Sequence, residues 1–130
     1  MASQTFLYRE HNGKLYPTLP ITISHLGKSV SFDALVDSGS TVTLLRPDIA
    51  EELGIPLERS IKRPITGLSS VSEGHEYTLE MRLFDEFFPC KVAFVRAFSF
   101  PLNILGRADF FDRHEILFRE RKRELLVTEV

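Results

Sequence analysis

The 130-residue chain has a single cysteine and no long apolar run. Cys90 cannot form a disulfide within the chain, which favours a reducing compartment. The first residues lack the apolar stretch of a signal peptide, and no segment approaches the roughly 18 consecutive apolar residues of a membrane-spanning helix. We therefore expect a cytoplasmic protein without a membrane partner, provided that the chain is not a fragment of a longer one.

An excess of one charge sign is also absent. Sixteen lysines and arginines stand against eighteen aspartates and glutamates, a formal net charge of −2. Binding to nucleic acid or to an anionic membrane by charge alone is therefore not expected. We expect this chain to recognise a binding partner through shape complementarity.

Most familiar catalytic patterns are missing. The sequence contains no G-x-S-x-G, Walker loop, H-E-x-x-H or G-x-G-x-x-G. His11, His25, His75 and His114 are scattered without the spacing of metal ligands, and each is expected to be a solvated surface residue. No metal site is predicted.

The chain has no internal repeat and no linker long enough to divide it, so we expect one domain at residues 19–130 after an N-terminal arm at residues 1–18. Two β-branched and apolar runs within residues 19–36 surround a turn-like His-Leu-Gly-Lys and predict a hairpin. Residues 46–54 predict a helix of about two turns, with a proline in the first turn and a glycine as the stop.

The second half of the chain predicts further strands. Apolar and polar residues alternate over residues 77–83, and residues 87–95 are expected to pair back after a turn. Residues 115–127 predict another hairpin, and residues 107–112 a second short helix. The predicted class is therefore mainly β, a small closed or sandwich-like sheet with one or two short helices.

Nine of the eleven phenylalanines lie beyond residue 80. Aromatic side chains suit strands and fill small β cores, so core packing is the expected role for most of them. The alternative is that Phe98 or Phe100 lines a binding groove, and the sequence does not choose between the two.

One segment, ALVDSGST at residues 34–41, carries candidate chemistry. Asp37 directly follows an apolar run, and Gly39 permits a tight turn or a close approach of the backbone. Ser38 and Ser40 can orient the carboxylate and the neighbouring backbone. Taken alone, the segment is better explained as an ordinary strand-ending Asx turn.

A second segment, PLNILGR at residues 101–107, changes this weighing. It places Gly106 and Arg107 after an apolar pair, at the start of the expected second helix. In order and separation, ALVDSGS and NILGR together resemble the single-domain retroviral-type (retropepsin-like) aspartic proteases. The resemblance covers roughly residues 19–127.

The resemblance implies a small closed, barrel-like acid protease fold that forms a two-fold dimer, each subunit contributing one Asp-Thr/Ser-Gly triplet. Asp37 would be the catalytic aspartate, Ser38 would supply the hydroxyl of the interlocking turns, and Gly39 would be the close-packed position. Ser40, Gly106 and Arg107 would support the site. No metal or organic cofactor is implied.

Residues 65–74 match the place of the family's flap. The resemblance assigns substrate binding to Ile65, Thr66, Gly67, Leu68, Ser69 and Ser70. Viral members carry an acidic partner for the arginine shortly after the triplet, where this chain has Ser40 and Thr41, so Arg107 needs another partner. For the dimer edge, residues 124–130 are the predicted strand.

Because the sequence holds one such triplet, a complete site requires a second copy. The resemblance therefore implies a homodimeric aspartic endopeptidase that cleaves extended peptide or protein substrates. Two alternatives remain. The domain could be a catalytically weak or inactive module for dimerisation or peptide binding, or a self-processing protease that trims its own arm at residues 1–18.

Overall fold

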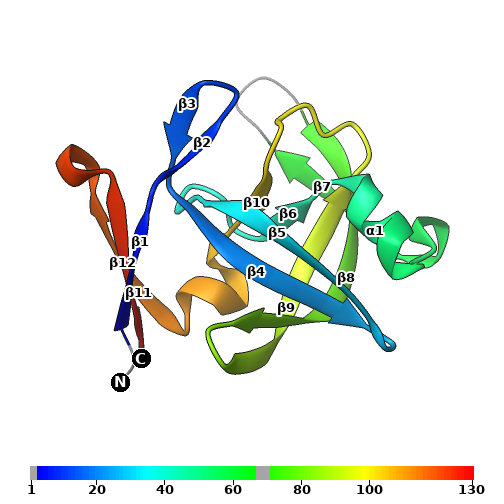
Figure 1. Ribbon diagram of the computed structural model, residues 1–130. Coiled ribbons are helices and arrows are strands. Elements are labelled where there is room, and N and C mark those ends of the chain that lie inside the picture. Colours follow the sequence, from blue (N-terminus) through cyan, green and yellow to red (C-terminus); the bar gives the residue numbers. More distant parts are fainter. Residues whose placement is uncertain (1–2, 67–70) are drawn as a thin grey trace.

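The computed structural model describes residues 3–66 and 71–130, and strands dominate it (Figure 1). The strands are β1 (Ser3–Leu7), β2 (Arg9–His11), β3 (Lys14–Tyr16), β4 (Thr18–His25), β5 (Lys28–Val36), β6 (Thr43–Leu45), β7 (Ile61–Thr66), β8 (Val71–Leu83), β9 (Glu86–Val95), β10 (Asn103–Leu105), β11 (His114–Arg119) and β12 (Glu124–Glu129). The helical segments are α1 (Pro47–Leu53) and the single turns η1 (Leu57–Arg59), η2 (Arg107–Phe111) and η3 (Glu120–Lys122). Within these described ranges, no helix has the length and apolarity to cross a membrane.

The main body is a closed barrel of strands in the order β4-β5-β10-β6-β9-β8. β8 pairs back onto β4, with Ile23 opposite Met81, and this pairing closes the ring. β7 pairs with β8 outside the ring and forms a hairpin with it. The prediction of a mainly β, closed architecture is thus confirmed.

Local sequence patterns produce the predicted hairpins and the first helix. The β4–β5 hairpin turns at Leu26 and Gly27, whose φ angles are 47° and 83°. Helix α1 begins at Pro47, where the missing N–H costs no hydrogen bond, and ends at Gly54 in the left-handed conformation. The helix contacts β5 and β9, and its buried residues belong to the hydrophobic core.

The barrel interior is filled by alternating residues of the long strands. Leu79, Met81 and Leu83 of β8 are at most 2% exposed, as the period of two predicts. Phe88, Phe94 and Phe110 are fully buried, which confirms core packing for these aromatic residues.

A second, three-stranded sheet contains both ends of the described chain, in the order β1-β12-β11 (Figure 1). Residues 3–16 of the N-terminal arm therefore form strands: β1 pairs with β12, and β2 pairs with β3. Tyr8 is buried, and its hydroxyl donates to Glu120. Because β12 is the central strand, residues 124–129 are not a free edge, and the prediction of a dimer edge there is wrong.

The prediction of a second short helix at residues 107–112 is also wrong, because this segment is not a regular helix. In η2, Ala108 has an extended ψ of 129° and Asp109 a φ of 64°. The Asp109 carboxylate accepts a hydrogen bond of 2.7 Å from the amide of Lys91 in β9. This long-range contact accompanies the left-handed backbone at Asp109, and sequence periodicity carries no signal for it.

Two of the four histidines are buried, which corrects the expectation that all are solvated. His75 and His114 are each 2% exposed, and both lie in strands rather than loops. His114 stacks on Phe110 with ring centroids 5.0 Å apart, and its Nδ1 lies 2.8 Å from the carbonyl oxygen of Phe110. An imidazole ring with one satisfied nitrogen can pack as an aromatic side chain.

Candidate active site

Asp37 lies at the end of β5, where the strand leaves the barrel. Its amide donates a 3.0 Å hydrogen bond to the carbonyl of Leu105, the last residue of the parallel neighbour β10. Val36 immediately before it is buried, whereas Asp37 is half-buried and Ser38 exposed. The barrel thus fixes the backbone of Asp37 and leaves the following turn at the surface.

The turn after Asp37 holds its carboxylate in place. The amide of Gly39 donates to Oδ1 of Asp37 at 2.8 Å, and the amide of Ser40 donates to the Asp37 carbonyl at 3.2 Å. A Cβ atom at position 39 would lie 3.1 Å from the same Oδ1, so glycine leaves room for this contact. The Ser40 hydroxyl donates to the carbonyl of Val42, which tightens the loop further.

The structure brings the two sequence motifs together. The amide of Arg107 donates to the Ser40 carbonyl at 2.9 Å, and the amide of Ala108 donates to that of Thr41 at 3.0 Å. Gly106 packs so closely that an added Cβ would stand 2.2 Å from the carbonyl oxygen of Val42. The Gly106 amide donates to the buried hydroxyl of Thr43.

Unlike Gly106, the side chain of Arg107 is not packed against the loop that follows Asp37. Arg107 is exposed, and among the described residues it takes part in no ion pair. Its backbone, rather than its guanidinium, contacts the Asp37 loop within the chain.

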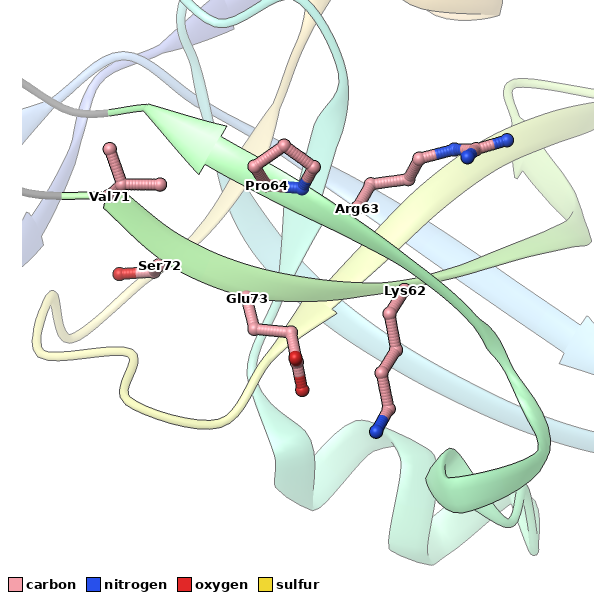
Figure 2. A pocket seen from close by; sticks show the side chains of 6 residues that line it. All are labelled: Lys62, Arg63, Pro64, Val71, Ser72 and Glu73. Carbon is pink, nitrogen blue, oxygen red and sulfur yellow. The ribbon is translucent and has the colours of Figure 1, made fainter.

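The hairpin β7–β8 contains the predicted flap residues that can be placed. Ile65 is half-buried and Thr66 exposed at the end of β7, while Gly67, Leu68, Ser69 and Ser70 lie outside the described residues. Gly74 of β8 stands opposite Arg63, and its lack of a side chain makes room for Ile65, because a Cβ there would lie 2.7 Å from Cγ1 of Ile65. A shallow hollow of about 340 Å³ lies on this hairpin rather than at Asp37, lined by Lys62, Arg63, Pro64, Val71, Ser72 and Glu73 (Figure 2).

His75 anchors the base of this hairpin and was not singled out by the sequence. Its Nδ1 lies 2.8 Å from the Ser60 hydroxyl and 3.0 Å from the Leu57 carbonyl, both in or next to η1. Because the Ser60 hydroxyl itself donates to the Leu57 carbonyl, Nδ1 is the donor in this cluster. The contact connects β8 to the segment that follows α1. A histidine within a strand of alternating polar and apolar residues does not indicate such a buried contact.

Cys90, the other reactive side chain of the barrel, is fully buried. Burial, together with the nearby negative charge of Asp109, raises the pKa of its thiol to about 12. The thiolate needed for nucleophilic attack or metal binding is therefore scarce at neutral pH. In the described part of the chain, no three histidine, cysteine or acidic side chains are grouped as ligands for a metal ion.

A family model described as aspartyl protease matches residues 19–107. The match covers more than half of the chain and spans both the Asp37 turn and the Gly106-Arg107 segment packed against it. The chain belongs to the aspartyl protease family. The resemblance predicted from ALVDSGS and NILGR is thereby confirmed.

Two solved structures show that this aspartyl protease has the retropepsin fold. A retropepsin-like aspartic protease from Rickettsia conorii superposes with a TM-score of 0.72 at 18% identity, covering 97% of this chain and 98% of the other. EIAV protease complexed with the inhibitor HBY-793 gives a TM-score of 0.56 at 19% identity, covering 76% of this chain and 88% of the other. No curated protein sequence matches the aspartyl protease described here.

Proposed function

We propose that this aspartyl protease is a homodimeric endopeptidase in which the Asp37 carboxylates of two copies activate one water molecule. The observation that carries the proposal is the turn at Asp37, whose carboxylate is held by the Gly39 amide and whose loop packs against Gly106. Membership of the family and the retropepsin fold support a hydrolase of the aspartic protease type.

A second copy is required because the chain supplies one carboxylate of this kind. The sequence contains one Asp-Ser/Thr-Gly triplet. Two of the other aspartates form ion pairs elsewhere: Asp33 pairs with Arg9, and Asp48 with Arg46. When two carboxylates lie about 3 Å apart, ionising both is costly because their negative charges repel. The pair therefore shares one proton, and aspartic proteases are the standard example.

The shared proton gives the pair both roles that peptide hydrolysis needs. The ionised carboxylate takes a proton from the water as its oxygen attacks the scissile carbonyl, and the protonated carboxyl hydrogen-bonds to the developing oxyanion. The titration belongs to the pair rather than to either Asp37 alone. We further propose that the exposed Ser38 hydroxyl contacts the partner's turn, and that Arg107 finds its ion-pair partner across the same interface.

The proposed substrate is an extended peptide that adds a strand beside the β7–β8 hairpin. Backbone hydrogen bonds would then provide affinity, and alternate side chains would fill pockets. Of the predicted substrate-binding residues, Ile65 and Thr66 end β7 at the position from which such contacts could be made. Together they are the described part of the proposed flap.

The first prediction concerns Asp37→Asn. An amide cannot accept the water proton or share a proton with its partner. We therefore expect the variant to cleave a quenched-fluorescence peptide library at least about a thousandfold more slowly than wild type at every pH from acidic to neutral, in line with the loss of an essential catalytic group. Asp85→Asn is the matched control, because Asp85 is exposed in the β8–β9 turn. Cleavage that survives Asp37→Asn would contradict the assignment.

One observation favours the alternative of a peptide-binding module with little turnover. Arg107 lacks an ion-pair partner among the described residues of its own chain, so the support expected for an active site is incomplete in one copy. Binding of an extended peptide without product, equal in wild type and Asp37→Asn, would favour this module. Cleavage that depends on Asp37 would exclude it.

A further inference from the structure

His75, at the base of the β7–β8 hairpin, has one ring nitrogen without a hydrogen bond. The residue is 2% exposed, and its Nδ1 lies 3.0 Å from the Leu57 carbonyl and 2.8 Å from the Ser60 hydroxyl. Since Nδ1 is the donor to these groups, Nε2 carries the lone pair of the neutral ring. Nε2 is buried and has no hydrogen-bond partner among the described residues. Such an atom is costly to bury, so its surroundings point to a function.

A carboxylate oxygen lies beside this nitrogen. Oε1 of Glu73 stands 3.4 Å from Nε2 of His75, and the Glu73 side chain is 57% exposed. A lone pair and a carboxylate oxygen are both acceptors, so no hydrogen bond joins them while the ring is neutral. Once Nε2 is protonated, it can donate to Glu73 in a charge-assisted hydrogen bond. The geometry therefore suits the imidazolium better than the neutral ring.

Other charged groups surround His75 at a greater remove. Lys62 of β7 stands opposite His75 in the strand pairing, and Figure 2 shows the side chains of Lys62 and Glu73 on the same side of the hairpin. Lys62 is exposed and takes part in no ion pair among the described residues. The remaining charged residues of the neighbouring elements are Arg63 and Glu76, which pair with each other on the opposite face of the hairpin, Glu58 and Arg59 of η1, and Arg96, which pairs with Glu58.

His75 is one of two side chains of β8 that connect the hairpin to the segment after α1. Tyr77 shares its face of the strand, and the Tyr77 hydroxyl donates to the Pro56 carbonyl at 2.7 Å. Leu57, whose carbonyl faces His75, belongs to the hydrophobic core. Among the described strands, β7 pairs with β8 alone, so the position of the whole hairpin depends on how β8 is held.

We propose that His75 is a positioning residue that gains a proton in acid, and that its contact with Glu73 then holds the base of the β7–β8 hairpin for substrate binding. This inference rests on the proposed function, in which the peptide lies beside this hairpin. A hairpin already held in one position loses less conformational freedom when a peptide pairs with it. Because imidazole groups change charge between pH 5 and pH 8, substrate binding is tighter at the acidic end of this range, and the added contact is lost as the pH rises.

The first test observes the ring itself, in the full-length Asp37→Asn protein so that the result does not depend on cleavage. Nitrogen-15 NMR spectra distinguish an imidazole with one proton on Nδ1 from one with protons on both nitrogens, and His75→Gln identifies the signal. We expect the first form at pH 8 and the second at pH 5. A ring that keeps a single proton at pH 5 would overturn this inference and leave the role of Asp37 intact.

The second test is the pH dependence of KM. Between pH 5 and pH 8, we expect the KM of wild type to rise at least about threefold more than that of His75→Gln, because glutamine cannot change its charge. Glu73→Gln should lose the same acid-dependent effect, and the double variant should lose no more than either single one. The pH profile of kcat should stay that of wild type, since the paired Asp37 carboxylates are unchanged. Melting curves at each pH establish that the variants fold.

Two variants serve as matched controls. Tyr77→Phe removes the hydrogen bond to Pro56 without removing an imidazole, so it should raise KM by the same factor at pH 5 and pH 8. Glu80→Gln removes an exposed carboxylate farther along β8 and should keep the wild-type profile.

Two kinetic outcomes would overturn the positioning role. One is a His75→Gln variant whose KM changes by the same factor at both pH values, as a purely structural residue would give. The other is a Glu73→Gln variant with the wild-type profile. Cleavage retained by Asp37→Asn would instead overturn the proposed function, and the ring spectra would not be affected by it.

Discussion

Gly106 lets the two motifs of the site pack together because it has no Cβ atom. A Cβ there would lie 2.2 Å from the Val42 oxygen and 2.9 Å from the Ser40 oxygen, and both are backbone atoms that cannot rotate away. We therefore expect Gly106→Ala to lower the free energy of unfolding by about 3 kcal/mol, the upper part of the range for overpacking. Urea denaturation measures this change.

Gly27→Ala separates this steric effect from the general cost of replacing a glycine. Gly27 has a φ of 83°, but no atom lies within 4 Å of the point that a Cβ would occupy, so only backbone strain of about 1 kcal/mol is expected. Equal losses in the two variants would show that the contact with the Asp37 loop is not what makes Gly106 sensitive.

At the scale of elements, a half-buried acidic cluster joins the β8–β9 hairpin to the terminal sheet. Glu86 Oε1 lies 3.9 Å from His114 Nε2 and 3.7 Å from Arg113 Nη1. Burial, then a hydrogen bond to Glu129 and its negative charge, raise the pKa of the Glu86 carboxyl, against the smaller lowering effect of Arg113. Protonated Glu86 thus stabilises the fold at acidic pH, and this contribution is lost as the pH rises through its folded-state pKa.

Glu86→Gln should consequently be more stable than wild type at neutral pH, with the difference vanishing as the pH falls below the ordinary range of a glutamate. His114 has the opposite effect. Burial lowers the pKa of its imidazole, so its contribution to the stability of the fold is lost as the pH falls. Melting temperatures of variant and wild type are therefore compared at each pH, and His114→Gln serves as a second reference that lacks the imidazole. A difference that does not change between pH 4 and pH 8 would contradict the prediction.

The elements that sequence predicts well are those determined by neighbouring residues. Pro47 and Gly54 delimit α1, and the alternation ending at Leu83 identifies β8, because both patterns act over a few positions. The family resemblance implied that Gly106 and Arg107 support the Asp37 turn, and in the structure backbone hydrogen bonds from Asp37 to Leu105 and from Arg107 to Ser40 join the two segments.

The features that sequence could not predict depend on residues far apart in the chain. Asp109 adopts its left-handed backbone beside the Lys91 amide, and His75 is buried against η1 rather than solvated. The central place of β12 follows from β1, more than 110 residues away, pairing with it. Periodicity and turn chemistry contain no information about such partners.

On the scale of the whole molecule, the N-terminal strand completes the three-stranded terminal sheet. β1 pairs with β12 from Ser3 to Leu7, and Phe6 packs on Phe84 with ring centroids 5.9 Å apart. We expect deletion of residues 1–7 to destabilise the protein by about 2–3 kcal/mol, the cost of exposing a large apolar side chain. Thermal melting of the truncated chain measures this loss.

Truncation also tests the idea that the arm is trimmed by the enzyme itself. A chain cut near Thr18 would lose β1, β2 and β3 together, and mass spectrometry after incubation would detect the shorter product. A truncated protein that melts like wild type would contradict the structural role assigned to β1.

The pairing of β1 with β12 has a last consequence for the path of the chain. The hydroxyls of Ser3 and Thr128 hydrogen-bond at 3.0 Å, so the two ends of the described chain meet at one point of the surface (Figure 1). The backbone is in effect a nearly closed ring, and a short linker could complete it. The ring could then be opened at the β4–β5 turn, where Leu26 is 90% exposed, and a circular permutant of this kind would retain every strand pairing of the barrel.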